Sequence, residues 1–342
     1  MSAGTASQTP RAHSQLMQMA MGFSVPFLLR VAAQLSLADH LANGPRTATE
    51  LAAVTGTNAS ALYRVLRTLA CIGVFKEDEA HQFALTALAE PLQSTSPGSV
   101  RNSILAITGD LFIIPWSKLL YSVQTGQPSF DQYFGVPFFD QLTKDPEEAR
   151  LFFDLLIGIN SSDAPAVAAA YDFSTFTNIT DIGGATGHIL TTILAAHPGP
   201  NGMVFDVPDN QAPAAELIQA RGMSDRVTFV PGSFFESVPA GSDLYILSHI
   251  LHDWSEEQCL AILANCHRAM TPSSRLLVIE MVLAEGNAFH PGKMLDMTML
   301  ATTTGQERTE SEYRDLLEKA RFKLSRVIPT SSAISIVEAV LA

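Results

Sequence analysis

A glycine-rich segment, residues 180–187 with the sequence TDIGGATG, is the feature that most constrains how this chain can fold. The residues leading into it, 176–182, are short and partly β-branched, as in a strand, and residues 188–197 carry apolar side chains at helical spacing. Glycine permits the tight turn between the two because it lacks a Cβ atom. A strand, a glycine turn and a helix in this order are typical of the first unit of a nucleotide-binding α/β domain.

Two carboxylates indicate which nucleotide suits this turn. Asp181 stands just before the glycines, where it would repel the pyrophosphate of a dinucleotide. It suits instead a ligand that carries an ammonium group and a sulfonium, as the amino-acid end of S-adenosylmethionine does. Asp206 ends the second expected strand, where a carboxylate can bind both hydroxyls of a ribose. Together with Gly183, Gly184 and Gly187, these residues predict a binding site for S-adenosylmethionine.

The alternation of strands and helices continues beyond Asp206. In a doubly wound sheet with the strand order 3-2-1-4-5, the fourth strand lies beside the first, and ligands bind at the carboxyl ends of the strands. Residues 249–254 and Glu280 should therefore lie near the glycine turn. We expect an α/β fold with a mostly parallel sheet and an antiparallel last strand. The further strands are expected at 227–230, 243–248, 275–280, 322–328 and 335–341, and the further helices at 213–222, 256–270 and 310–320.

His252 is the candidate general base at that edge of the sheet. Methyl transfer from a sulfonium is an in-line displacement, which requires alignment of the reacting atoms and removal of the proton of the nucleophile. An imidazole can take that proton at neutral pH, and Glu280 or Glu307 can hold its other nitrogen in one tautomer. The alternative is that His252 only packs at the start of a helix.

A metal, a nucleic acid and a membrane are not expected as partners. His249, His252 and Asp253 lie close together in sequence, but no His-Glu-x-x-His pattern accompanies them. The net charge of −13 argues against nucleic acid, because phosphate binding needs clustered Lys and Arg. No uninterrupted apolar run is long enough to span a membrane, and residues 1–14 have no apolar signal core. We therefore expect a cytoplasmic protein.

The first third of the chain is expected to form a separate helical domain. Residues 16–41 carry apolar side chains on nearly every face of a helix that is interrupted at Pro26, so this segment needs burial on more than one side, which favours a contact with a second subunit. Signals for two short helices and a hairpin follow, in a winged-helix arrangement. Its DNA-binding helix would offer only Arg64 and Arg67 to a groove. Dimerisation is therefore favoured over DNA binding.

Three domains are expected. Residues 1–100 would form the winged-helix dimerisation domain, 101–167 a helical connecting region that contributes to the substrate pocket, and 168–342 the cofactor-binding catalytic domain. The connecting region is rich in aromatic side chains. The candidates to cover a flat acceptor are Phe112, Trp116 and Phe153.

Nearly the whole chain resembles one family, the S-adenosylmethionine-dependent O-methyltransferases that include plant caffeate and flavonoid enzymes, acetylserotonin methyltransferase and bacterial enzymes modifying antibiotics and phenazines. The resemblance implies a Rossmann-like class I methyltransferase domain after a winged-helix domain that forms a homodimer, with S-adenosylmethionine as cofactor. The matching motifs are DIGGATG at 181–187, FDVP at 205–208, DRV at 225–227, GSFFESVP at 232–239, LHDWS at 251–255, VIE at 278–280 and GQERT at 305–309.

The resemblance also implies roles for individual residues. Gly183 and its neighbours would hold the methionine part of the cofactor and Asp206 its ribose. His252 would be the general base. Ser233 and Phe234 would lie beside the adenine, and Glu280 and Glu307 beside His252. A helix that lines the acceptor pocket would carry Asp296, Met297 and Thr303.

Two departures from the family pattern lie on the adenine side of the expected site. Ser233 stands where relatives carry an acid, and Ser248 where many carry a lysine. A serine can still make one hydrogen bond, worth about 0.5–1.5 kcal/mol, so weaker cofactor binding is expected. Two alternatives stay open: a relative that keeps the cofactor but catalyses hydroxylation, decarboxylation or a pericyclic reaction, and a ligand-sensing DNA-binding regulator. The favoured acceptor is a small aromatic or polycyclic metabolite, whose identity does not follow from the sequence.

Overall fold

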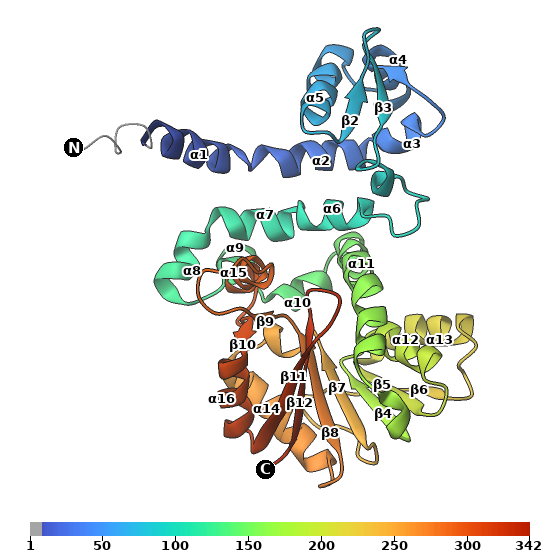
Figure 1. Cartoon of the computed structure of the whole chain (residues 1–342), viewed down its shortest axis with the longest axis vertical. Helices are drawn as coiled ribbons and strands as arrows, with labels where there is room; N and C mark the ends of the chain where they lie inside the picture. The colour runs from blue at the N-terminus through green and yellow to red at the C-terminus, as the bar shows by residue number, and fades with distance from the viewer. Residues whose placement is uncertain (1–8) are drawn as a thin grey trace, which may run out of the picture. The chain divides into compact units, whose positions relative to one another are not determined.

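The computed structural model of the chain describes residues 9–342. These residues form two compact units, which are shown in Figure 1. The first unit contains residues up to Ile113 together with Pro146–Gly158, and the second contains Ile114–Asp145 and Ile159–Ala342. Helices α7 (Asp110–Ser117) and α11 (Pro146–Ala170) cross from one unit into the other.

The first unit begins with three helices in series. The helical segment is interrupted at Gly22 and Phe23 and again near Ser36. It is not interrupted at Pro26, where the interruption was expected. Pro26 lies in the first turn of the second helix, where its missing N–H has no intrahelical acceptor to lose. The elements of this unit are α1 (Thr9–Met21), α2 (Ser24–Gln34), α3 (Leu37–Leu41), β1 (Arg46–Thr47), α4 (Ala48–Thr55), α5 (Ala59–Cys71), β2 (Phe75–Glu77), β3 (Gln82–Leu85), η1 (Glu90–Leu92) and α6 (Arg101–Ile107).

The expected winged-helix arrangement is present in residues 46–85. Thr47 caps α4 in a capping box with Glu50, and Asn58 caps α5. The hairpin of β2 and β3 is extended by β1 into a three-stranded antiparallel sheet. Leu51 and Leu66 are fully buried against this sheet and help to form the core of the unit.

One helical stretch among the described residues, Arg11–Gln34, is long and apolar enough to cross a membrane by length and composition; a bent pair, Arg101–Ser117 with Leu119–Thr125, passes the same test only if it counts as one span. Polar residues interrupt the first stretch, so it contains no continuous apolar run that would have indicated it from the sequence. Length and composition do not assign it to a membrane, because an apolar surface that contacts a second subunit meets the same criteria. Its exposed apolar side chains are Leu16, Met17, Met19, Met21, Phe23 and Phe27.

The second unit is built on a seven-stranded sheet with the order β11-β12-β8-β7-β4-β5-β6. Five neighbouring strands are parallel and reproduce the predicted order 3-2-1-4-5, and β12 is antiparallel to both of its neighbours. The prediction of a mostly parallel sheet with an antiparallel last strand is confirmed. The strands are β4 (Asn178–Ile182), β5 (Asn201–Asp206), β6 (Val227–Pro231), β7 (Leu244–Ser248), β8 (Arg275–Glu280), β11 (Phe322–Pro329) and β12 (Ser335–Leu341).

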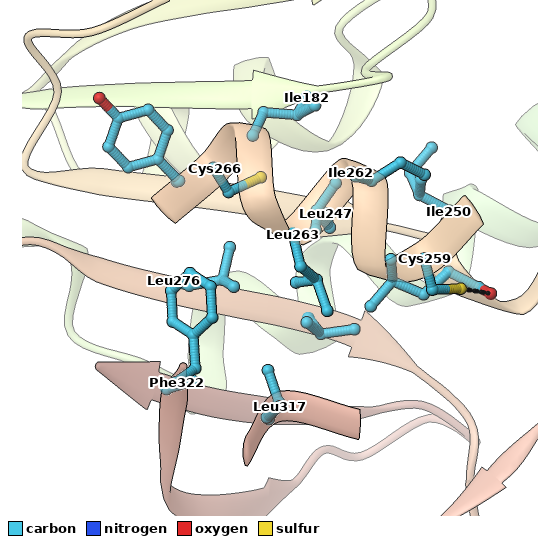
Figure 2. Packing of buried hydrophobic residues seen from close by; sticks show 14 of the residues in the cluster. Ile182, Leu247, Ile250, Cys259, Ile262, Leu263, Cys266, Leu276, Leu317 and Phe322 are labelled. Carbon is cyan, nitrogen blue, oxygen red and sulfur yellow. Dashed lines mark hydrogen bonds between the residues drawn. The ribbon is translucent and has the colours of Figure 1, made fainter. Parts of the chain in front are cut away.

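Helices cover both faces of this sheet (Figure 1). One face packs against α12 (His188–Ala196), α13 (Gln211–Ala220) and the C-terminal part of α11. The other packs against α14 (Glu256–Ala269) and α16 (Glu310–Lys319). Figure 2 shows the second core, in which apolar side chains of α14 pack in one cluster with those of the sheet and of α16. Each fully buried Leu or Ile in these layers contributes about 1.5–3 kcal/mol.

Shorter elements connect the layers. Strand β9 pairs with β10 in parallel, with Val282 opposite Arg308, which brings the residues after Glu280 beside those after Glu307. These elements are α8 (Leu119–Thr125), α9 (Ser129–Phe134), α10 (Phe138–Leu142), η2 (Phe173–Thr175), η3 (Pro208–Asn210), η4 (Leu251–Asp253), β9 (Val282–Leu283), α15 (Gly292–Thr302) and β10 (Arg308–Thr309).

Candidate active site

The glycine turn after β4 has a backbone that requires glycine at two positions. Gly183 and Gly187 adopt φ angles of 71° and 78°, in the left-handed region that side chains disfavour. A Cβ atom on Gly184 would lie 2.5 Å from Asp181 Oδ2, and one on Gly187 would lie 2.7 Å from Val204 Cγ2. The turn therefore brings its backbone against Asp181 and the neighbouring strand β5.

Asp181 is a buried carboxylate without a hydrogen-bond partner among the described residues. It is 1% exposed, and neither of its side-chain oxygens is hydrogen-bonded. Burial, with added repulsion from Asp206, raises the pKa of Asp181 to about 7. A buried, unpaired carboxylate is unfavourable unless a cation compensates it. The Asp181 carboxylate therefore fits a ligand that presents an ammonium group or a sulfonium.

Asp206 ends β5 and lies beside the glycine turn. Its Oδ2 accepts a hydrogen bond from the backbone N–H of Ala185 at 2.7 Å, and its Oδ1 accepts from Val207 N and Asn210 Nδ2 at 2.6 and 3.0 Å. Because a carboxylate has about four acceptor positions, Asp206 can support the turn and still accept a ribose hydroxyl.

Of the residues expected beside the adenine, Phe234 lies near the glycine turn. A Cβ on Gly183 would lie 3.4 Å from the Phe234 ring and would collide with Ile250. The hydroxyl of Ser233 accepts a hydrogen bond from Phe235 N at 3.3 Å. The hydroxyl of Ser248, at the end of β7, is buried and has no partner among the described residues. Ser248 therefore keeps a donor that a ligand can use.

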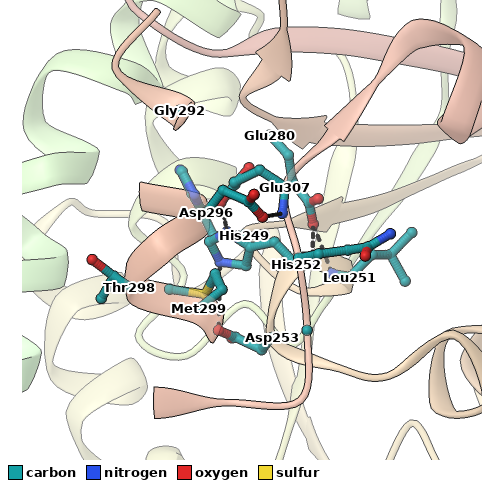
Figure 3. Close-up of polar contacts among 12 residues, drawn as sticks. His249, Leu251, His252, Asp253, Glu280, Gly292, Asp296, Thr298, Met299 and Glu307 are labelled. Carbon is teal, nitrogen blue, oxygen red and sulfur yellow. Dashed lines mark hydrogen bonds and ion pairs between the residues drawn. The ribbon is translucent and has the colours of Figure 1, made fainter. Parts of the chain in front are cut away.

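His252 lies in η4, directly after β7, as the sheet order predicts. Its Nδ1 is 2.6 Å from Glu307 Oε1, and both side chains are buried. Its Nε2 is 3.6 Å from Asp253 Oδ1. Figure 3 shows His252 and Glu307 together with Asp296 of α15, whose Oδ1 accepts a hydrogen bond from Glu307 N at 2.9 Å. Glu307 therefore holds the ring and is itself held by α15.

Glu280 binds the backbone of the loop that carries His252. Its Oε1 accepts hydrogen bonds from the backbone N–H groups of Ile250, Leu251 and His252 at 3.0, 2.6 and 3.3 Å, and its Oε2 accepts one from the Tyr313 hydroxyl. Glu280 thus lies beside His252, and of the two carboxylates that could hold the ring nitrogen it is not the one that does so. Glu280 binds the backbone of the loop, and only Glu307 binds ring nitrogen Nδ1.

The carboxylates around His252 change its basicity. Burial alone would lower the pKa of His252, but Asp253, the hydrogen bond and charge of Glu307, and Glu280 together raise it to about 10. Burial also raises the pKa of Asp253 to about 6, against the opposing effect of His252. The site therefore favours the protonated imidazole, so that His252 binds a proton strongly.

The six candidates for acceptor contact fall in different places. Asp296 and Met297 lie on α15 and Thr303 directly follows it, where the Thr303 hydroxyl donates to Met299 O at 3.2 Å and accepts from Gly305 N at the same distance. Burial raises the pKa of Asp296. Phe112 and Phe153 belong to the first unit and Trp116 to the second, so a grouping of these three around one acceptor stays a prediction.

Several residues at the site had no role assigned to them from the sequence. Arg308 is buried and donates from Nη1 to Leu251 O at 3.1 Å. Trp254 stacks on Phe139, with ring centres 5.5 Å apart. These contacts join segments that are distant in sequence. The position of Arg308 directly after Glu307 was the available signal for that residue, and Phe139 had none beyond its aromatic character.

Within residues 9–342, no group of three or more His, Cys, Asp or Glu side chains is arranged so that it could hold a metal ion. His249 and His252 have ring centres 5.5 Å apart. Asp163 lies beside Nε2 of His249, whereas Glu307 lies beside Nδ1 of His252, so the two carboxylates do not face a common point between the rings.

Comparison with known proteins agrees with this geometry. Residues 116–323 match the family model of the O-methyltransferase domain, and residues 17–95 match that of the O-methyltransferase dimerisation domain. The chain is 43% identical over 326 residues to phenazine O-methyltransferase PhzM of Lysobacter antibioticus, covering 95% of both proteins. It is 34% identical over 315 residues to aclacinomycin 10-hydroxylase RdmB of Streptomyces purpurascens, covering 88% of this chain and 82% of that protein.

A solved relative contains both kinds of ligand. An O-methyltransferase from neocarzinostatin biosynthesis, crystallised with S-adenosylmethionine and 2-hydroxy-5-methyl naphthoic acid, superposes with a TM-score of 0.82 at 33% identity, covering 93% of this chain and 96% of that one. The matched family models, the sheet order and these relatives all indicate the same family. This chain belongs to the S-adenosylmethionine-dependent O-methyltransferases and is a methyltransferase.

Proposed function

We propose that this enzyme transfers a methyl group from S-adenosylmethionine to a hydroxyl of a small aromatic or polycyclic metabolite, with His252 as the general base. The observation that carries the proposal is the buried contact of 2.6 Å between His252 Nδ1 and Glu307 Oε1 at the carboxyl edge of the sheet, beside the glycine turn. A carboxylate can only accept hydrogen bonds, so Nδ1 carries the hydrogen. The neutral ring then has its lone pair on Nε2.

The cofactor-binding residues are assigned from their unmet hydrogen-bonding capacity. The Asp181 carboxylate would bind the ammonium end, with Gly183, Gly184 and Gly187 allowing close approach of the backbone. Asp206 would bind the ribose, and the adenine would lie beside Ser233, Phe234 and Ser248. Bound S-adenosylmethionine supplies an electrophilic methyl group on a positively charged sulfur.

The basicity of His252 suits a phenolic substrate. A phenol has a pKa of about 10, close to the raised pKa of His252. Proton transfer between groups of similar pKa has little thermodynamic cost. His252 takes the acceptor proton on Nε2, and Glu307 and Asp253 stabilise the imidazolium that forms. Glu280 keeps the loop in place through its backbone hydrogen bonds.

The acceptor side of the proposal rests on relatives and on α15. Two of the relatives named above act on a phenazine or bind a naphthoic acid, which supports a flat aromatic acceptor here. Asp296 and Met297 of α15 and Thr303 directly after it would line its site, and Phe112, Trp116 and Phe153 would cover it. The hydrogen bond between Asp296 and the backbone of Glu307 links the acceptor-lining helix to the base.

The assembly proposed is a cytoplasmic homodimer formed through the N-terminal domain, without nucleic acid or membrane as a partner. We assign residues 1–100 to dimerisation, 101–167 to the connecting region and 168–342 to catalysis. The match of residues 17–95 to a dimerisation domain and the exposed apolar side chains of α1 and α2 support this. Light scattering of the purified enzyme should give twice the chain mass; a monomer at micromolar concentration would contradict the assignment.

A non-methylating reaction is the second candidate, because one relative is named as a hydroxylase. An oriented base is not needed where no acceptor hydroxyl loses its proton, so His252 held by Glu307 favours methyl transfer. A pool of phenols and polycyclic hydroxy compounds, incubated with enzyme and S-adenosylmethionine carrying a labelled methyl group, should give products with the label on oxygen by mass spectrometry. Labelled cofactor that stays intact while an acceptor is hydroxylated or decarboxylated would support the second candidate instead.

A further inference from the structure

His249 is held in an unusual backbone conformation next to the proposed base. Its φ angle is 53°, in the left-handed region that residues other than glycine rarely adopt. Its N–H donates to Ile279 O at 3.1 Å, which ties it to the neighbouring strand β8. Strained residues persist only where the surrounding structure enforces them, and they cluster at functional sites. The conformation of His249 therefore indicates a functional role for its side chain.

The side chain of His249 faces the buried carboxylate of Asp163 on α11. Nε2 of His249 lies 3.4 Å from Oδ2 of Asp163, and the two side chains are 15% and 6% exposed. Yet Nε2 is buried and makes no hydrogen bond with any described residue. The two groups are close enough for an ion pair but are not aligned for a hydrogen bond. His249 Nε2 thus has unused hydrogen-bonding capacity beside Asp163, whose other oxygen, Oδ1, accepts a hydrogen bond from the Ser162 hydroxyl at 3.5 Å.

This pair lies beside the proposed reaction centre. The rings of His249 and His252 have centres 5.5 Å apart and are inclined at 50°, and Figure 3 shows both side chains in the same cluster with α15. At this spacing, the two imidazoles can each contact one of two polar atoms carried on neighbouring positions of an aromatic ring.

The chemistry of the pair selects the kind of group it can bind. A hydroxyl can accept a hydrogen bond from His249 Nε2 and donate one to Asp163 Oδ2 at the same time. A carboxylate in that position would be repelled by Asp163, and a hydrogen or methyl substituent would leave the buried Nε2 of His249 without a hydrogen bond.

We propose that His249 and Asp163 bind a second hydroxyl of the acceptor, on the ring position next to the hydroxyl that is methylated. The enzyme then prefers vicinal dihydroxy-aromatic acceptors to monohydroxylated ones and to ortho-hydroxy acids. The proposal rests on the role of His252 as the base that binds the reacting hydroxyl, and adds a second polar contact to the same acceptor.

Three matched probes test this preference: 2,3-dihydroxynaphthalene, 2-naphthol and 3-hydroxy-2-naphthoate, which differ only in the group beside one hydroxyl. Their affinities for the enzyme saturated with S-adenosylhomocysteine are measured by calorimetry, so no methyl transfer is required. The diol should bind about 10- to 100-fold more tightly than 2-naphthol, as expected for hydrogen bonds to charged groups. The hydroxy acid should bind most weakly.

Two variants change the pair without changing the base. His249→Asn keeps a residue that tolerates the left-handed backbone but has a shorter side chain, and should remove the preference for the diol. Asp163→Asn removes the negative charge and supplies an amide donor, so binding of 3-hydroxy-2-naphthoate should improve by about tenfold while that of the diol weakens. Asp154→Asn is the matched control, because Asp154 is a carboxylate on the same helix that pairs with Arg150.

A wild-type enzyme that binds 2-naphthol as tightly as the diol would overturn the proposal, as would a preference that survives in both variants. These results are separable from the proposed function. If replacement of His252 leaves methyl transfer intact while the order of the three probes is as expected, the base assignment fails and the second hydroxyl site stands. If replacement of His252 abolishes methyl transfer but the probes bind equally, the second site fails alone.

Discussion

Replacement of Glu307 by Gln isolates the effect of one buried charge on the proposed base. The amide oxygen of Gln can still accept the hydrogen bond from His252 Nδ1, which is 2.6 Å from Glu307 Oε1 in the wild type. What the variant loses is the negative charge that helps to raise the pKa of His252 to about 10. Asp253 and Glu280 are unchanged, so only part of that increase should disappear.

The size of the effect follows from the distance. An opposite charge in direct contact shifts a pKa by about 1–3 pH units, and each unit corresponds to about 1.4 kcal/mol. The pKa of His252 should therefore fall from about 10 to roughly 7–9 in the variant, with the imidazolium losing about 1.4–4 kcal/mol of stabilisation. Because only the neutral ring accepts the acceptor proton, kcat/KM of the wild type should rise with pH towards pH 10, and the variant should reach its plateau at lower pH.

Two measurements follow the change. The pH profile of kcat/KM gives the pKa in the free enzyme, and histidine labelled at Cε1 gives it directly by NMR, with His252→Asn used to assign the resonance. Glu310→Gln is the control, since Glu310 is an exposed carboxylate nearby in sequence that pairs with Arg314. Equal profiles for wild type and Glu307→Gln, or an equal shift in the control, would refute the reasoning.

Further outcomes can be checked on the same preparations. Asp181→Asn should stabilise the cofactor-free enzyme increasingly as pH rises from 4 to about 7, because the raised pKa of Asp181 makes its ionisation costly in the folded state; denaturant melts measure this stability. The same variant should bind the cofactor about 10- to 100-fold more weakly, as measured by calorimetry. Ser233→Asp should tighten the cofactor by about 3- to 10-fold if Ser233 lies beside the adenosine, and weaker binding would displace that assignment. The stability that wild type gains over Glu307→Gln should be full below pH 6.5 and vanish as pH rises through about 10, since the folded pKa of His252 is raised above its unfolded value; urea titrations across this range test the sign. Treatment with a chelator should leave activity unchanged, and loss of activity that zinc or magnesium restores would revive a metal site.

The parts of the site that the sequence predicts are those set by sheet topology. A strand order of 3-2-1-4-5 places Asp181, Asp206 and His252 at one edge of the sheet whatever the side-chain packing, and the structure has that order. The exact partners of each side chain depend on packing between distant segments. Glu280 could be placed near His252 from its strand, but that its oxygens bind loop N–H groups and not the ring depends on three-dimensional contacts.

The break between α1 and α2 shows the same limit at a smaller scale. Pro26 was the natural place for an interruption, yet a proline within the first turn fits a helix that starts two residues earlier. The contact between Asp163 and His249 could not be predicted at all, because a single acidic residue on a long helix carries no sequence signal of the histidine it faces.

The rate of a single turnover in His252→Asn tests the central claim most directly. With the acceptor identified by the labelling experiment, enzyme in excess and saturating cofactor, the account predicts methyl transfer about 10²–10⁴-fold slower than in wild type, with little dependence on pH and nearly unchanged cofactor affinity. A variant that transfers the methyl group at the wild-type rate, with the wild-type pH profile, would show that His252 does not remove the acceptor proton.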